Sequence, residues 1–237
     1  MKKKTKHFLL SCLVAAPLTL FAQGGGADYG QGSLRYGVKV GSTLNQINNA
    51  GMLVGFNGGG FVSYGALDIM DVQGEILYAV SGASQDDYTK YYDGFETTVE
   101  GIRFFNRSVS IQSIKVPVMA ALKFASSNSG SVVPKLLIGA SYSYNFAVFE
   151  RHDKEYLFPN GEKSIVGNRL ENVTSSYESS QVEAIGGVSI DFKTEGGRVF
   201  TLDMRYHLGL LNIQKFERPY EGGAQFPSTL AINFATT

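Results

Sequence analysis

The chain has 237 residues, of which 43% are hydrophobic and 18% charged, with 21 basic and 21 acidic side chains. This length predicts one or two domains. Nothing in the sequence suggests the clustered basic surface that a nucleic-acid partner requires. The single cysteine is Cys12, close to the N-terminus, so no disulfide or thiol chemistry is expected in the rest of the chain.

The N-terminal residues have the composition of an export signal. Four lysines precede an apolar run over residues 8–22, which Pro17 and polar residues interrupt and which is too short to span a bilayer. We therefore expect a cleaved signal peptide over residues 1–22 and a flexible periplasmic leader over 23–33. Removal of the signal leaves 17 basic residues against 21 acidic ones.

The remainder, residues 34–237, alternates apolar with small or polar residues at a period of two. In residues 200–210, for example, Phe200, Leu202 and Met204 alternate with Thr201 and Asp203. Because successive side chains of a strand point to opposite faces, each such stretch has one apolar and one polar face. The pattern predicts eight strands, over residues 34–44, 54–64, 69–81, 112–124, 135–149, 180–193, 200–210 and 228–234.

The number of apolar residues decides which face points outward. The interior of an eight-stranded barrel has room only for side chains, and about forty apolar residues would not fit there. A soluble barrel with an apolar calyx would show the same alternation but conflicts with this volume. The sequence therefore predicts an all-β fold, an eight-stranded antiparallel transmembrane up-and-down β-barrel in the outer membrane.

The connections and the aromatic residues indicate the orientation. Short turns follow the second, fourth and sixth strands, whereas residues 82–111 and 150–179 form connections of about thirty residues, the asymmetry of outer-membrane barrels. This places both termini in the periplasm and the long connections outside the cell. Two girdles of aromatic residues, one near each end of the strands, agree with this orientation. Their members are Tyr36, Tyr64, Phe124, Phe192, Phe200 and Phe234 on one side, and Phe56, Tyr78, Tyr142, Tyr144 and Tyr206 on the other.

The inward face carries charges of both signs. Buried charges must be paired, so we expect a lumenal ionic network that plugs the barrel. A narrow polar path, or a small-ligand site inside the lumen, is the alternative. The expected network consists of Lys39, Asp71, Glu75, Lys115, Lys123, Glu183, Asp191, Asp203, Arg205 and His207.

An enzymatic interpretation is weaker. Asp203 and His207 share a strand face, and Ser189 on the neighbouring strand would complete a serine hydrolase set, but Arg205 beside His207 is explained by an ion pair. Residue types alone do not supply the mutual geometry that catalysis needs. We therefore expect no catalytic residues, and no metal site or cofactor.

Partner contacts are expected in two places. The apolar face meets outer-membrane lipid, and the long connections 82–111 and 150–179, rich in tyrosine and polar residues, are candidate surfaces for protein partners. They are equally consistent with ordinary solvated loops. The sequence does not indicate an oligomeric state.

Four segments resemble the PorT-like outer-membrane barrel proteins of Bacteroidetes. They are Tyr36–Gly41, Gly74–Tyr78, Ile114–Val118 and Met204–Leu210, which are similar in sequence and order to strand motifs of that family. The resemblance implies a small eight-stranded barrel and an accessory role in protein secretion. The chain departs from the usual aromatic end of outer-membrane proteins, because Ala235-Thr236-Thr237 follow the last expected strand.

The proline of the third motif, Pro117, cannot donate a ladder hydrogen bond, so we expect a β-bulge at that position. The motifs are structural and do not identify an activity. The expected function is therefore a non-enzymatic structural or interaction role in the envelope, with the secretion accessory and the narrow channel or ligand binder as alternatives.

Overall fold

The computed structural model describes residues 31–47, 51–85, 87–91, 100–124, 131–195, 197–213 and 227–236. The expected signal peptide and nearly all of the expected leader lie outside these residues. Among the residues described, no helix has the length and apolar character needed to cross a membrane.

The described residues form β-strands and one short 3-10 helix, η1 (Thr174–Ser176). The expected strand 180–193 coincides with β8, and most other strands are longer than expected. The strands are β1 (Leu34–Ile47), β2 (Gly51–Leu67), β3 (Met70–Gln85), β4 (Tyr88–Tyr91), β5 (Gly101–Lys123), β6 (Val132–Leu157), β7 (Lys163–Asn172), β8 (Ser180–Lys193), β9 (Val199–Gly209) and β10 (Pro227–Thr236).

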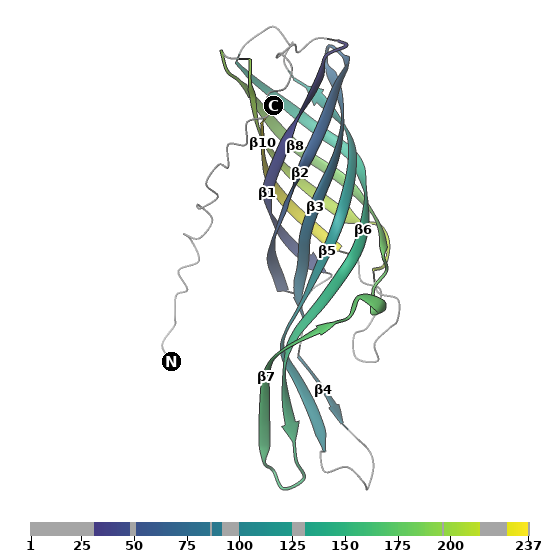
Figure 1. Cartoon of the computed structure of the whole chain (residues 1–237), viewed down its shortest axis with the longest axis vertical. Helices are drawn as coiled ribbons and strands as arrows, with labels where there is room; N and C mark the ends of the chain where they lie inside the picture. The colour runs from purple at the N-terminus through teal and green to yellow at the C-terminus, as the bar shows by residue number, and fades with distance from the viewer. Residues whose placement is uncertain are drawn as a thin grey trace.

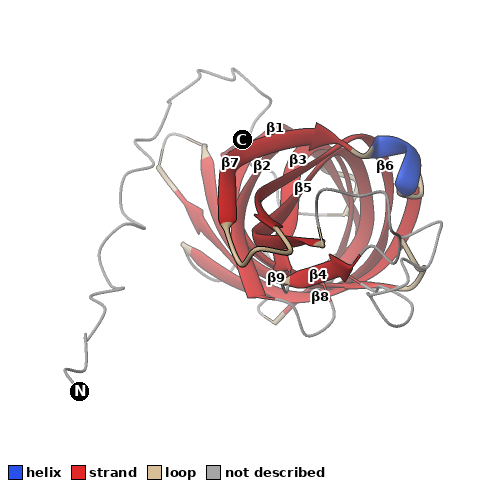
Figure 2. Ribbon diagram, turned by 90° about the horizontal axis from the view of Figure 1, so that it is seen from below, coloured by secondary structure: helices blue, strands red, loops and turns tan. Residues whose placement is uncertain are grey.

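Eight of these strands close into a ring, which confirms the expected barrel. The antiparallel order is β5-β3-β2-β1-β10-β9-β8-β6, and pairing of β5 with β6 closes the circle. Figure 2 shows the closed ring in a view along the barrel. The start of β1 and the end of β10 lie at the same end of the ring as the turns after β2 and β8, which we call the turn end.

The two long connections differ from expectation, because much of each is β-structure. Beyond the ring, residues 101–104 of β5 pair with β4, and residues 149–157 of β6 pair with β7. We call this four-stranded extension, made of β4, β7, residues 101–106 and residues 149–157, the arm. Figure 1 shows it projecting from the end of the barrel opposite the C-terminus. Residues 92–99 of the first connection lie outside the described residues.

The apolar face of the ring points outward, as the volume argument predicts. Val62, Ile76 and Val118 expose half or more of their surface, whereas the alternating residues face the interior. All eleven residues of the two expected aromatic girdles are exposed on the outer surface, and Phe146 joins them. The outer face therefore has the pattern of a lipid-facing band.

Register irregularities occur at places that the sequence did not reveal. The ladder passes through Pro117, which faces Ser141, without a register shift, so the expected bulge there is wrong. The shift lies instead between Gln112 and Ser113, where Phe146 is the extra residue of β6. Asn145 and Val148 are three positions apart and would lie on opposite faces of a regular strand. Because the extra residue exchanges the two faces, both point inward.

Candidate functional site: a closed lumen and a projecting arm

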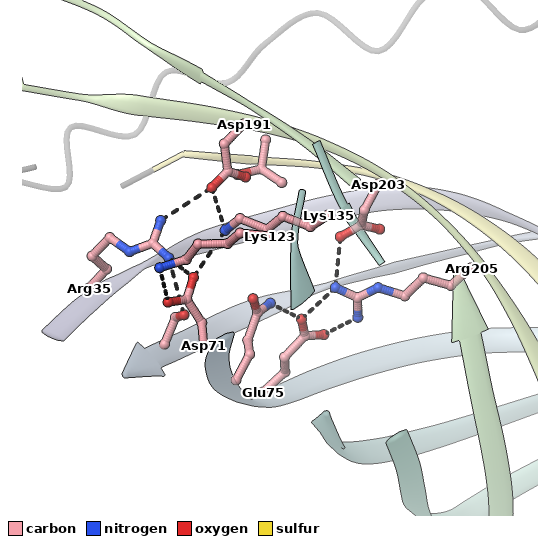
Figure 3. A network of polar contacts seen from close by, with 11 residues as sticks. Arg35, Asp71, Glu75, Lys123, Lys135, Asp191, Asp203 and Arg205 are labelled. Carbon is pink, nitrogen blue, oxygen red and sulfur yellow. Dashed lines mark hydrogen bonds and ion pairs between the residues drawn. The ribbon is translucent and has the colours of Figure 1, made fainter. Parts of the chain in front are cut away.

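The lumen next to the turn end contains an ion cluster contributed by five strands. Asp71 on β3 lies 2.6 Å from Arg35 on β1 and 2.6 Å from Lys123 on β5. Lys135 on β6 lies 2.6 Å from Asp191 on β8, which also contacts Arg35 at 3.2 Å. Figure 3 shows how this turn-side cluster bridges strands that are not neighbours in the ring.

The central cluster, formed by Lys39, Glu75, Asp203 and Arg205, lies further into the barrel. Arg205 donates two hydrogen bonds of 2.9 Å to the carboxylate of Glu75 and one of 2.7 Å to Asp203. Lys39 contacts Glu75 at 2.6 Å and Asp203 at 2.7 Å. Paired, bidentate contacts of this kind are the strong class of ion pair. They tie β9 to β3 directly across the lumen (Figure 3).

A third cluster is centred on Glu183. Lys115 Nζ lies 2.7 Å from one oxygen of this carboxylate, and His207 Nδ1 lies 2.9 Å from the other. Gln181 donates to the same group at 3.0 Å. Together the three clusters fill successive levels of the interior with paired charges.

An apolar plug closes the lumen on the arm side of the Glu183 cluster. It is held partly by the segment that links β7 to β8, where Val173 N–H donates to Val148 O at 2.9 Å and Tyr177 is buried. This connection therefore joins the arm to the plug. The plug consists of Ile47, Ala83, Val109, Ile111, Val148, Tyr177 and Ile213.

Small cavities remain between these levels. Those near the central cluster and the Glu183 cluster leave about 10 to 20 Å³ for the centre of a water molecule. Such a volume holds one or two water molecules. It is far below the several hundred cubic ångströms typical of small-ligand pockets.

All ten residues expected in the lumenal network lie inside the barrel, and each contacts an oppositely charged group or, for His207, a carboxylate. The expectation omitted Arg35 and Lys135, which share the inward parity of Lys39 and Ser141 and could have been found by extending the alternation. It also omitted Arg107 and Glu150, which form a buried pair at 2.9 Å beyond the bulge.

The residues considered for a hydrolase do not assemble. Ser189 lies opposite Asp203 in the ladder, whereas His207 lies opposite Ile185. His207 is instead held by Glu183. Within the described ranges, no group of three or more His, Cys, Asp or Glu side chains is placed to hold a metal ion.

The outer face of the arm carries a ladder of exposed charges. Arg103 on β5 lies 3.1 Å from Asp87, next to β4, and 3.9 Å from Glu155 on β6, which contacts Lys163 on β7 at 3.5 Å. These contacts connect β5, β6 and β7 with the residue that precedes β4. Because most of these side chains are well exposed, each pair contributes little to stability.

The inner face of the arm contains a buried histidine. His152 is 2% exposed and lies edge-on to Phe104, with ring centroids 5.4 Å apart. Glu171 lies 3.5 Å from its Nε2 and is itself bound by Lys154 at 2.8 Å. Burial lowers the pKa of His152 below its ordinary value of 6.5.

Asp153 joins two β-bulges at the base of the arm. Its carboxylate accepts a 2.9 Å bond from the side chain of Asn106 on β5 and a 2.6 Å bond from the backbone N–H of Asn168 on β7. Both asparagines have positive φ, 51° and 58°, the left-handed conformation that asparagine tolerates. The two hydrogen bonds hold the pKa of Asp153 below its ordinary value.

Comparisons with solved structures find matches of low sequence identity. The Ail attachment invasion locus protein of Yersinia pestis is 11% identical, with a TM-score of 0.37, over 87% of this chain and 99% of that chain. A second structure of Ail contains the heparin analogue sucrose octasulfate. Neisserial surface protein A is 12% identical, with a TM-score of 0.42, over 86% of this chain and 97% of that one. No curated protein matches the sequence.

The family assignment rests on the sequence itself. Residues 21–215, which cover most of the ring and the whole arm, match the model of the outer membrane protein beta-barrel domain. The described structure supplies the closed eight-stranded ring and the apolar outer band that such a domain requires. This chain therefore belongs to the outer membrane protein beta-barrel domain family.

Proposed function

We propose that the protein is a non-enzymatic envelope protein whose barrel anchors the arm in the outer membrane, so that the arm contacts a partner outside the cell. The observation that carries the proposal is the contrast between a filled lumen and an ordered extension. The three ion clusters and the apolar plug occupy the interior, whereas the arm continues two ring strands into the surroundings.

The contacts inside the lumen indicate that its charged residues close the barrel. They do not favour a channel or a ligand site. A conduction path would have to break pairs such as Arg205–Glu75, whose side chains are fully buried. Breaking a buried pair is costly, because it leaves an uncompensated charge. The small cavities leave no room for a solute larger than water.

The orientation belongs to the same proposal. With the termini and short turns in the periplasm, the arm projects outward, because it lies at the opposite end of the ring (Figure 1). The mature chain has no cysteine, so single-cysteine labelling tests this. An impermeant maleimide should label Asn160→Cys in intact cells, and Thr194→Cys only after lysis. The reverse pattern would refute the orientation.

The PorT resemblance adds a second candidate, an accessory role in protein secretion. The turn end offers little contact surface in the described residues, since the turn after β2 consists of Asp68 and Ile69 only. A secretion partner would therefore meet the arm or the residues that the structure does not describe. Unchanged secretion in a deletion strain would contradict this role.

The decisive experiment for the main proposal separates anchor from arm. Replacing both residues 87–106 and residues 149–172 by short turns, while keeping the ring, should leave outer-membrane insertion intact and abolish binding of surface partners. Planar-bilayer recordings of the intact protein should show no conductance. A steady conductance, or full partner binding without the arm, would overturn the proposal.

A further inference from the structure

Strand β7 forms an open edge of the arm. Its residues pair with β6, and no other described strand pairs with its far side. Nine of its ten residues are exposed, and Val166 is the half-buried one. An edge of this length presents unpaired backbone groups to another chain.

The hairpin that precedes β7 shows which groups these are. Phe158 N–H donates to Glu162 O at 3.1 Å, so these two residues form a hydrogen-bonded pair. Hydrogen-bonded and non-hydrogen-bonded pairs alternate along an antiparallel ladder. The backbone N–H and C=O groups of Lys163 and Ile165 therefore point away from β6.

The other end of the strand gives the same result independently. Val173 N–H donates to Val148 O at 2.9 Å, which continues the register of Asn172 with Phe149. By the same alternation, the backbone groups of Leu170 and Asn172 point away from β6. The edge thus offers two short sets of donors and acceptors, one on each side of the bulge.

The bulge also places the two large apolar side chains of the edge on the same face of the arm. Ile165 and Leu170 are 64% and 60% exposed. Five positions apart, they would lie on opposite faces of a regular strand. The extra residue between Val166 and Arg169 brings both onto the face of Arg151 and Glu155, their partners on β6.

From these placements, and resting on the proposed function of the arm, we propose that an extended polypeptide segment of another protein adds to the β7 edge as a fifth strand. Its backbone pairs with Lys163, Ile165, Leu170 and Asn172. Its side chains alternate, with apolar residues against Ile165 and Leu170 and polar residues beside Arg169 and Glu171. Strand addition takes its affinity from backbone bonds and its specificity from alternate side chains.

A second copy of the chain fits the edge less well. In a two-fold β7–β7 pair the bulges of both copies would lie in the same short ladder and interrupt it twice. Bulges and charged residues hinder the addition of any strand to an edge, but a regular segment of another protein meets only the one bulge of β7. The segment of another protein is therefore the occupant that the edge favours.

The test uses the full mature chain in lipid nanodiscs and a synthetic decapeptide that alternates apolar and polar residues. A peptide of the same composition without alternation is the control. Amide exchange measured by NMR should slow about tenfold at Lys163, Ile165, Leu170 and Asn172 when the alternating peptide binds, and should not change at Ser164 or Val166. Equal protection by the control peptide would overturn the inference.

Two double variants separate backbone from side-chain contributions. Ile165→Pro with Leu170→Pro removes two edge-facing donors but no bond to β6, as an edge strand permits. Peptide binding should weaken about tenfold or more, the loss expected for two backbone hydrogen bonds. Ile165→Thr with Leu170→Thr keeps the donors and should weaken binding less. Unchanged exchange at Ser164 and Val166 shows that β7 remains paired with β6.

Two results contradict the proposal in different ways. Surface-partner binding that disappears on arm deletion but survives the double proline variant would refute strand addition and leave the proposed function standing. Self-association of the purified protein that the same prolines abolish would assign the edge to a second copy and refute the heterologous partner.

Discussion

Strands β5 and β6 lie partly in the ring and partly in the arm. Comparing the two parts shows how a lipid-facing surface restricts the residue pattern of a β-strand. Within the ring, one face meets lipid and the other the lumen, so exposed and buried positions alternate, with apolar residues such as Ile114 and Val118 on the outer face. In the arm, neither face of the same strands is reserved for lipid. Arg103, Phe105 and Asp153 accordingly share its outer face.

The ion pairs of the two regions differ in the same way. Arg205 in the ring is 1% exposed and bound by two carboxylates, whereas Arg103 in the arm is 48% exposed. Buried and exposed pairs of the same chemistry have very different consequences when one partner is removed. Four predictions test this contrast.

The largest effect is expected from Arg205→Met. The variant leaves Glu75 and Asp203 short of a cation in the lumen and should lower the free energy of unfolding by about 3–5 kcal/mol. The matched arm variant Arg103→Met should lower it by no more than about 1 kcal/mol. Urea titration in lipid vesicles, followed by the gel mobility of folded barrel, measures both. Equal losses would remove the distinction between the two regions.

A somewhat smaller loss is expected from Ile111→Ala in the apolar plug. Ile111 is buried among residues of several strands, so its truncation should cost about 2–5 kcal/mol. The exposed Ile165 of the arm supplies the control, and Ile165→Ala should change stability by about 0.5 kcal/mol or less. The same urea titration applies, and a stable Ile111→Ala protein would show that the plug is not packed.

Asp153→Ala should loosen the arm without affecting the ring. The carboxylate binds Asn106 and Asn168, and loss of both bonds should lower the local stability of the arm. Amide exchange should accelerate in β7 and remain unchanged in β1 and β9. Asp87→Ala, which removes only an exposed contact, is the control, and faster exchange in the ring would contradict a role confined to the joint.

The smallest effect is the pH dependence of the arm. Because burial lowers the pKa of His152 in the folded state, the unfolded arm binds the proton more readily. The contribution of neutral His152 is therefore complete above pH 6.5 and is lost as the pH falls towards its folded pKa. As the pH falls from 7.5 to 5.5, the protection factors of the amides in residues 149–157, which correct for the pH dependence of intrinsic exchange, should fall in the parent protein but not in His152→Asn. A fall of the protection factors in both proteins would point to another group.

The sequence predicted the ring well because every ring strand obeys one physical rule. Residues 180–193 coincide with β8, and even Phe61, an apolar residue on the polar face, keeps its inward parity. Inside the lumen it lies under Lys39, whose Nζ is 5.6 Å from the ring centre. The alternation therefore tolerates single exceptions.

The arm and the Arg107–Glu150 pair could not be predicted in the same way. The extra residue Phe146 inverts the alternation of β6, and nothing in its side chain distinguishes it from its aromatic neighbours. Beyond that point, both faces of the strands carry polar residues, which resemble a loop in composition. Pro117, the residue that did suggest a bulge, faces Ser141 in an unbroken ladder.

The bulges at Phe146 and around Asn106 also allow the length of the arm to change. Residues of β5 and β6 beyond these bulges pair with each other in a register that is shifted from that of the ring. The length of the two strands can therefore change in the arm without moving a charged residue of the lumen. Removing two residues from each of β5 and β6 shortens the extension by about 7 Å and keeps both faces. The distance between the tip of the arm and the ring is therefore a property that paired two-residue deletions in β5 and β6 can tune.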